Sequence, residues 1–205
     1  RSGLQGVKFI ATTPATGAVT INAGTNNGTL TLGSAGLEAL AGAPAPTINA
    51  PVVIGADQQW NTVANVTMNG RLSGSANLTK VGNGTLTIDS AGYTIPSDFS
   101  GELRIYQGPI SLDRITASGG SNRNSVFSSL TINNTQLTVN QGNAFRLAIS
   151  GNINLVGDSA INNGDLTNMA SGKITDAGQS RTLVKVGGNT LNILGTGNDY
   201  SGGTI

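Results

Sequence analysis

The feature that most constrains this chain is a short pattern in which two branched aliphatic residues flank one other residue. Thr or Asn usually occupies the middle position. Because successive side chains of a β-strand point to opposite faces, each triplet predicts a short strand with one apolar face. The triplets are Val19–Ile21, Leu30–Leu32, Leu86–Ile88, Leu103–Ile105, Leu130–Ile132, Leu137–Val139, Leu147–Ile149, Ile153–Leu155 and Leu191–Ile193.

Turn residues separate these triplets. Asn-Gly pairs occur at 27–28, 69–70, 83–84 and 163–164, and both residues accept a positive φ at little cost. Only Ala35–Leu40 has a helical spacing, and its glycine and the following prolines reduce it to a turn or short insertion. No run of apolar residues is long enough for a membrane-spanning helix. We therefore predict an all-β chain.

An internal repeat organises the strands. Leu78–Ile88 recurs as Leu183–Ile193, and Val52–Trp60 aligns with Ile153–Ile161. The repeat length is about 100 residues, so we expect one continuous segment, 1–205, with copies at about 1–108 and 109–205. Two immunoglobulin-like domains would also give this period. Strands of constant form joined by turns of varying length favour a β-solenoid instead.

The repeated residues resemble a known family. Leu78–Ile88, followed by Phe99–Gly101, Leu103–Ile105 and Gly108, is similar to the autotransporter-associated β-strand repeat of bacterial surface proteins. The copy at 183–205 is close to the same pattern. Tyr93–Pro96 is an insertion and Gly188-Asn189 a reversal, and both lie in expected turns. The resemblance implies a right-handed parallel β-helix in a large secreted or surface protein, with no catalytic residues to carry over.

Composition excludes several functions. The chain has no Cys and no His, so it has no disulfide, thiolate or imidazole metal site and no Ser-His-Asp triad. A net charge of +1 creates no field for nucleic acid or anionic lipid. Charged residues are 10% of the chain, against about 25% in ordinary domains. Like charges would stack between turns of a solenoid, so we expect ladders of Thr and Asn on its outer face.

A few single residues have two possible roles. Lys80 and Lys185 occupy equivalent repeat positions, and we expect each to flank a turn with its stem over apolar surface; a cationic ligand site is the alternative. Trp60 aligns with Ile161, which favours a core position over a sugar-stacking platform.

Candidate chemistry is sparse. Asp89 and Asp113 could meet across neighbouring turns as a hydrolytic pair, with Asp113-Arg114 as weak support for a lyase. Gly195–Asp199 partly matches a calcium-binding turn, and a plain turn is the simpler interpretation. Five glycosylation-type sequons are near chance in an Asn- and Thr-rich chain. They begin at Asn27, Asn65, Asn77, Asn83 and Asn133. We predict no catalytic, cofactor-binding or metal-binding residues, and no enzyme.

The expected function is a non-catalytic structural segment of a bacterial secreted or cell-surface protein, forming a stiff stalk or a filament scaffold. One alternative is an adhesin that binds glycan or host protein through its outer face or the loops at 38–47, 116–125 and 174–182. A second is a polysaccharide-cleaving β-helix. Expected partners are further turns of the same chain or other copies end to end, with no nucleic acid and no membrane insertion. Because the chain starts at Arg1, we expect it to be part of a longer protein.

Overall fold

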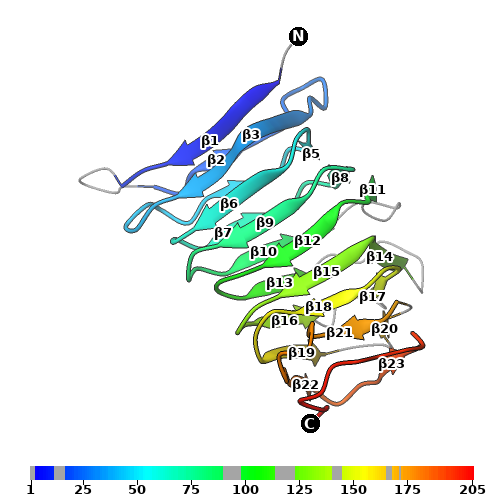
Figure 1. Ribbon diagram of the computed structural model, residues 1–205. Coiled ribbons are helices and arrows are strands. Elements are labelled where there is room, and N and C mark those ends of the chain that lie inside the picture. Colours follow the sequence, from blue (N-terminus) through cyan, green and yellow to red (C-terminus); the bar gives the residue numbers. More distant parts are fainter. Residues whose placement is uncertain are drawn as a thin grey trace.

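A computed structural model describes residues 3–11, 17–89, 98–113, 123–139, 145–164, 168–170 and 172–205. These residues form a β-solenoid, in which parallel strands stack turn upon turn between the two ends of the chain (Figure 1). Every strand pairing in these ranges is parallel. The predicted parallel β-helix is therefore confirmed, and the two-domain sandwich is excluded. None of the described segments is a helix capable of crossing a membrane.

Twenty-three short strands make up these ranges. They are β1 (Leu4–Phe9), β2 (Thr20–Ile21), β3 (Leu30–Ala39), β4 (Thr47–Ile48), β5 (Val52–Ile54), β6 (Gln58–Thr62), β7 (Val66–Met68), β8 (Leu72–Gly74), β9 (Leu78–Val81), β10 (Leu86–Asp89), β11 (Asp98–Phe99), β12 (Glu102–Ile105), β13 (Ile110–Asp113), β14 (Arg123–Phe127), β15 (Ser129–Ile132), β16 (Gln136–Val139), β17 (Phe145–Ile149), β18 (Ile153–Leu155), β19 (Ser159–Asn163), β20 (Asn168–Ala170), β21 (Ile174–Thr175), β22 (Leu183–Val186) and β23 (Leu191–Ile193).

Three strands make one turn of the solenoid. From β5 to β22 the chain completes six such turns, and strands three apart in sequence order stack on one another. The second strands of the turns continue in the order β6-β9-β12-β15-β18-β21, and the third strands in the order β7-β10-β13-β16-β19-β22. The long strand β3 joins two sides, because its first half pairs with β5 and its second half with β6.

Turn lengths vary while strand positions do not. In the sheet of third strands, the step between register partners is 20 residues from Val66 to Leu86, 24 from there to Ile110, and 27 to Leu137. Insertions are thus confined to the connections, where extra backbone costs little.

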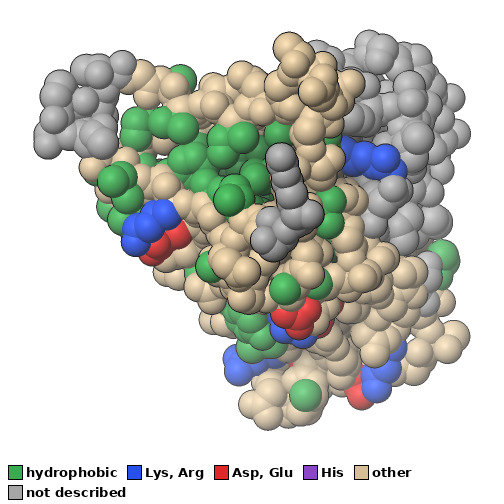
Figure 2. Space-filling model, turned by 90° about the horizontal axis from the view of Figure 1, so that it is seen from above, with side chains coloured by type: hydrophobic (Ala, Val, Ile, Leu, Met, Phe, Trp, Pro, Cys, Tyr) green, Lys and Arg blue, Asp and Glu red, His purple; other side chains and the backbone are tan. Residues whose placement is uncertain are grey.

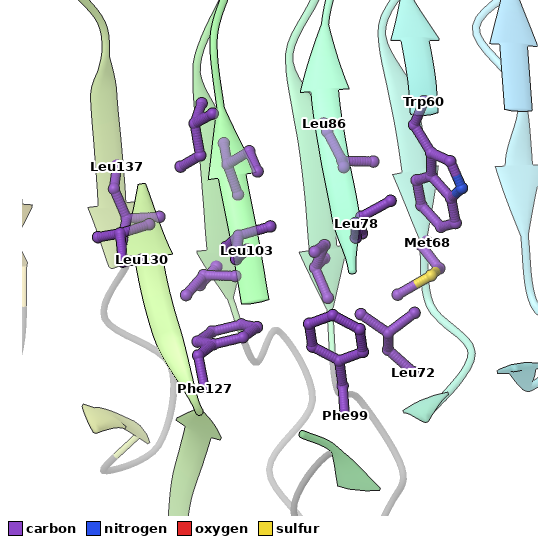
Figure 3. Packing of buried hydrophobic residues seen from close by; sticks show 14 of the residues in the cluster. Trp60, Met68, Leu72, Leu78, Leu86, Phe99, Leu103, Phe127, Leu130 and Leu137 are labelled. Carbon is purple, nitrogen blue, oxygen red and sulfur yellow. The ribbon is translucent and has the colours of Figure 1, made fainter. Parts of the chain in front are cut away.

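The core is a set of stacked apolar columns. Leu78, Leu103 and Leu130 are consecutive register partners, and each is at most 1% exposed (Figure 3). The rings of Phe99 and Phe127 meet edge to face at a centroid distance of 5.8 Å. Branched aliphatic residues recur in these columns because they pack well on a pleated buried surface.

Outside the core, asparagines form a ladder. The Asn49 amide donates to Asn22 Oδ1 at 2.8 Å, and the Asn69 amide donates to Asn49 Oδ1 at 2.9 Å. Each residue directly follows a strand of the same sheet, so the side chains repeat at the strand spacing. The expected ladder of like polar residues is confirmed at these positions.

One expectation for local structure is wrong. Ala35–Leu40 does not form a separate turn or insertion, because residues 30–39 are the single strand β3. Leu37 and Ala39 point inward and Glu38 points outward, which is a strand alternation. Gly36 adopts a φ of 62° within this strand. The spacing of Leu37 and Leu40 suggested a helix because a short apolar run carries little period information.

The two copies of the sequence repeat lie on different sides of the solenoid. Leu78–Ile88 covers β9 and β10, whereas Leu183–Ile193 covers β22 and β23. β9 is the second strand of its turn and β22 is the third of its turn, because thirteen strand steps separate them. Thirteen is not a multiple of the three strands that make one turn. Matching residues of the two copies therefore lie on different sides of the solenoid.

Some sequence predictions lie outside the described residues. They concern the Tyr93–Pro96 insertion, Arg114 and the loop residues 116–122.

Candidate functional site

Lys80 is the most unusual side chain of the core. It is 0% exposed and lies in the inward column between Trp60 and Ile105, its register partners on β6 and β12. Lys80 flanks a turn, as predicted, but its ammonium is buried together with the stem and does not lie at the surface as that of a turn-flanking lysine usually does. The Leu78-Thr79-Lys80 triplet has the same alternation as the apolar triplets, and this signal places its third residue inward.

Three backbone carbonyl oxygens hold the buried ammonium. Lys80 Nζ donates to the oxygens of Gly82 at 2.6 Å, Gln107 at 2.8 Å and Val81 at 3.3 Å. Gln107 belongs to the next turn of the solenoid, and its side chain accepts from the Gly82 N–H and donates to Asn83 Oδ1. Lys80 therefore ties two successive turns together without a carboxylate partner among these contacts.

Two glycines permit the close approach of the Lys80 ammonium to these carbonyl oxygens. Gly82 has a φ of 82° and Gly108 a φ of 67°, a region that residues with a Cβ rarely adopt. A Cβ on Gly108 would also lie 2.9 Å from Lys80 Nζ. The Lys-x-Gly part of the repeat thus encodes a turn whose carbonyls face a lysine.

Lys185 makes the same local turn in a more open setting. Its Nζ donates to the oxygens of Val186 at 2.9 Å and Gly187 at 2.6 Å, and Gly187 has a φ of 84°. Unlike Lys80, it is partly exposed, as expected for a turn-flanking charge. The pair shows that one motif gives one turn geometry on two different sides of the solenoid.

We predict that the stability of the fold rises between pH 8 and pH 10.5 because of Lys80. Burial lowers the pKa of Lys80 from 10.5 to about 8. Below pH 8 both the folded and the unfolded chain hold this proton. Between the two values only the unfolded chain holds it, so deprotonation favours the folded form as the pH rises. Urea unfolding from pH 7 to pH 10 measures the effect.

The informative comparison is with Lys80→Met, which removes the titrating group and keeps a similar stem. This variant should lack the rise attributed to Lys80, whereas Lys185→Met should retain it. Equal pH slopes for the wild type and Lys80→Met would contradict the assignment.

Trp60 is a core residue, as predicted. It is 0% exposed, and its indole N–H donates to Gln58 Oε1 at 2.9 Å. Ile161, its counterpart in the sequence repeat, is also buried but belongs to a different sheet. No face of the Trp60 ring is available for stacking with a sugar.

A set of Asp and Asn side chains that sequence reasoning missed bridges successive turns. Asp57 accepts the backbone N–H of Asn77, and Asp158, its repeat counterpart, accepts that of Thr182, both at 2.8 Å. Asn65 and Asn77 accept from Thr85 and Glu102 in the same way. Most of these acceptors directly precede an inward residue of a strand, which is a signal visible in sequence.

Asp176 organises the turn after β21. Its carboxylate accepts the backbone N–H groups of Gly178, Arg181 and Ser201 at 2.8 to 2.9 Å, and also the Ser201 hydroxyl at 3.2 Å. The N–H of Ser201 is the foremost cause that lowers the pKa of Asp176 to about 2. This residue lies within the 174–182 loop that was predicted as a ligand-binding candidate, and its acceptor atoms are occupied by that loop and by Ser201.

Asp89 and Asp113 are neighbours, as predicted from the sequence. They are register partners on β10 and β13. Asp89 is only 3% exposed, so a bulky polysaccharide has no open path to its carboxylate. Within the described part of the chain, no group of three or more Asp and Glu residues is arranged to hold a metal ion.

The Gly195–Asp199 segment is a turn closed by its own side chains. The Asn198 amide donates to the Gly195 oxygen at 2.9 Å, and its Oδ1 accepts the Ile174 N–H at 2.8 Å. The Asp199 carboxylate pairs with Lys173 at 2.6 Å. These contacts agree with the plain turn that was preferred over a calcium site.

Of the sequon asparagines, Asn65, Asn77 and Asn83 are engaged in cross-turn hydrogen bonds. Asn27 lies in an exposed turn with a φ of 49°. The three hydrogen-bonded asparagines therefore hold successive turns to one another.

The binding loop predicted at 38–47 is partly strand, because residues 38 and 39 belong to β3 and residue 47 starts β4.

Comparisons with known proteins return no match: no family model, no curated protein and no solved structure resembles this chain closely enough to be reported.

Proposed function

We propose that this chain is a non-catalytic structural segment of a bacterial secreted or cell-surface protein, where it acts as a stiff spacer. The observation that carries the proposal is the unbroken stack of turns, in which apolar columns and cross-turn hydrogen bonds continue from β5 to β22. Its polar side chains are used to tie turns together, as in the contacts of Lys80, Asp57 and Asp176. We expect such a fold to resist bending, because hydrogen bonds and packed side chains join each turn to its neighbours along the sheets.

The assignment to a bacterial surface rests on the resemblance of Leu78–Ile88 and Leu183–Ile193 to the autotransporter-associated repeat. The low charge of the chain is consistent with stacked outer columns of Thr and Asn rather than with a charged binding surface.

Distances between spin labels test the stiffness. The chain has no cysteine, so Gln59→Cys and Thr175→Cys provide unique labelling sites on the outer face of one sheet. Their strands, β6 and β21, are five strand spacings apart, or about 24 Å. We expect a single narrow distance distribution near that value. A broad distribution would contradict a stiff spacer.

Binding assays separate the spacer from an adhesin. Glycan-array and host-cell binding by the isolated chain should be no stronger than for an unrelated β-solenoid. Saturable binding that is lost on substitution of outer residues such as Thr67 or Asn69 would overturn the spacer proposal in favour of the adhesin.

A further inference from the structure

The chain contains four Asn-Gly pairs, a sequence that is chemically labile. They lie at 27–28, 69–70, 83–84 and 163–164. The glycine nitrogen can attack the side-chain carbonyl carbon of the asparagine, and glycine hinders this attack least because it has no Cβ. The new N–C bond closes a succinimide ring, while the side-chain nitrogen takes up the proton of the glycine N–H and leaves as ammonia. Water then opens the ring to aspartate or isoaspartate.

In three of these pairs the preceding turn of the solenoid holds the glycine nitrogen. Gly70, Gly84 and Gly164 donate their N–H groups to the carbonyl oxygens of Ile48 (3.0 Å), Thr62 (2.7 Å) and Val139 (2.8 Å), respectively. A Cβ on Gly70 or Gly84 would overlap a backbone oxygen of that turn, so these peptides have no room to rotate. The nitrogen can therefore reach the asparagine side chain only if the two turns separate.

The asparagine side chains of the same three pairs are also held across turns. Each has one hydrogen-bond partner on a neighbouring turn: Asn69 pairs with Asn49 (2.9 Å), Asn83 with Gln107 (2.8 Å) and Asn163 with the Thr190 carbonyl (2.9 Å). Asn163 is in addition 0% exposed. The carbonyl carbon that would be attacked is thus fixed as well as the attacking nitrogen.

Asn27 has neither restraint. Asn27 and Gly28 are both exposed, in the connection between β2 and β3. The Gly28 N–H donates to the Ala23 oxygen at 2.8 Å, and Ala23 belongs to the same connection. Within the described residues, no group forms a hydrogen bond with the Asn27 side chain. The attacking and the attacked atoms are therefore tied only to their own local turn.

We propose that Asn27 is a site of spontaneous deamidation, and that stacking protects the asparagines of the other three pairs. The reaction needs no partner other than water. All four pairs consist of the same two residues, so the fold causes the difference in reactivity. Stacked turns open only when part of the solenoid unfolds, whereas an exposed local turn opens at little cost.

Deamidation at Asn27 changes the charge of the molecule and leaves the stack intact. Charged residues are 10% of the chain, and Figure 2 shows them to be sparse on the end of the stack that it views. One new carboxylate lowers the formal net charge from +1 to 0. Isoaspartate also adds one carbon atom to the backbone. The exposed connection can absorb this atom, since connections on a protein surface tolerate insertions.

Site-resolved mass spectrometry tests the proposal. The full 205-residue chain is kept folded at mildly alkaline pH, and samples taken over several days are digested with pepsin at acid pH, where little deamidation occurs. We expect Asn27 to convert about tenfold faster or more than Asn69, Asn83 or Asn163, because a stacked turn must open before it reacts. A rate at any of these three equal to that at Asn27 would overturn the proposal, as would no conversion at Asn27.

The chain unfolded in guanidinium chloride is the control for intrinsic reactivity. All four asparagines should convert at similar rates there, because stacking is lost. A preference for Asn27 that persists in the unfolded chain would mean that neighbouring residues set the rates, and it would contradict protection by the fold.

The variant Asn27→Asp carries one of the two products and tests whether the turn accepts it. It should unfold at the same urea concentration as the wild type, because the position is exposed and makes no side-chain hydrogen bond within the described residues. A lower midpoint would contradict the expectation that deamidation leaves the stack intact.

Discussion

Replacing Trp60 with alanine is expected to lower the free energy of unfolding by about 3–5 kcal/mol. The ring is fully buried between the register partners Leu37 and Lys80, so its removal leaves a cavity that neighbouring strands cannot close. It also leaves the Gln58 side-chain oxygen without the indole N–H that it accepts. Since domains are typically stable by about 5–15 kcal/mol, this loss is large. Equilibrium urea unfolding followed by far-ultraviolet circular dichroism measures it.

Val63→Ala is the matched control, because Val63 follows the same strand and is 42% exposed. It should change the stability by no more than about 0.5 kcal/mol. Trp60→Phe should fall between the two, since a ring remains but the hydrogen bond to Gln58 does not. A small effect of Trp60→Ala would mean that this ring is not enclosed by the core.

Replacing Gly36 with alanine is expected to be the most damaging change at a glycine among those with positive φ. Gly36 has a φ of 62°, and a Cβ there would lie far inside the contact distance of the Gln59 carbonyl oxygen. The left-handed conformation costs about 1–2 kcal/mol for a residue with a Cβ. The overlap adds about 1–3 kcal/mol. We therefore expect a combined loss of about 2–5 kcal/mol, measured by the same unfolding experiment.

Gly24→Ala separates the two contributions. Gly24 has a φ of 71°, but a Cβ there would meet no atom within 4 Å. This variant should show only the conformational cost. If Gly24→Ala and Gly36→Ala destabilise the fold equally, close packing against β6 contributes nothing at Gly36.

Strand positions and the burial of Trp60 were predictable because they depend on local alternation. The side-chain period of two fixes which residues share a face, whatever strand lies beside them. This is why triplets such as Leu103–Ile105 and Leu137–Val139 form strands with two buried residues. The identity of the stacked partner was harder to predict, because the step between register partners varies from 20 to 30 residues among the described strands.

The burial of Lys80 was not predicted, because charge was given more weight than position. A lysine normally keeps its ammonium in water. Here the Gln107 oxygen, twenty-seven residues further along the chain, supplies an acceptor that no local pattern reveals. The carbonyls of Val81 and Gly82 complete the set only because Gly82 has a positive φ. The cost of burial depends on this geometry, and sequence alone does not show it.

The roles of Asp57, Asp158 and Asp176 were missed for a related reason. Each carboxylate accepts N–H groups from a later turn, so its partner is distant in sequence. Acidic residues were searched for as catalytic pairs or metal ligands. Their observed use is to satisfy backbone donors at the edges of strands.

The thirteen-strand offset between the two repeat copies has a consequence for how such a chain lengthens. β9 and β22 carry the same motif on different sides of the solenoid, so both sides accept the same repeated sequence. A duplicated segment therefore does not need to span a whole number of solenoid turns in order to fit the stack. Groups attached at the same position of successive copies would then lie on successive sides of the solenoid instead of forming one row.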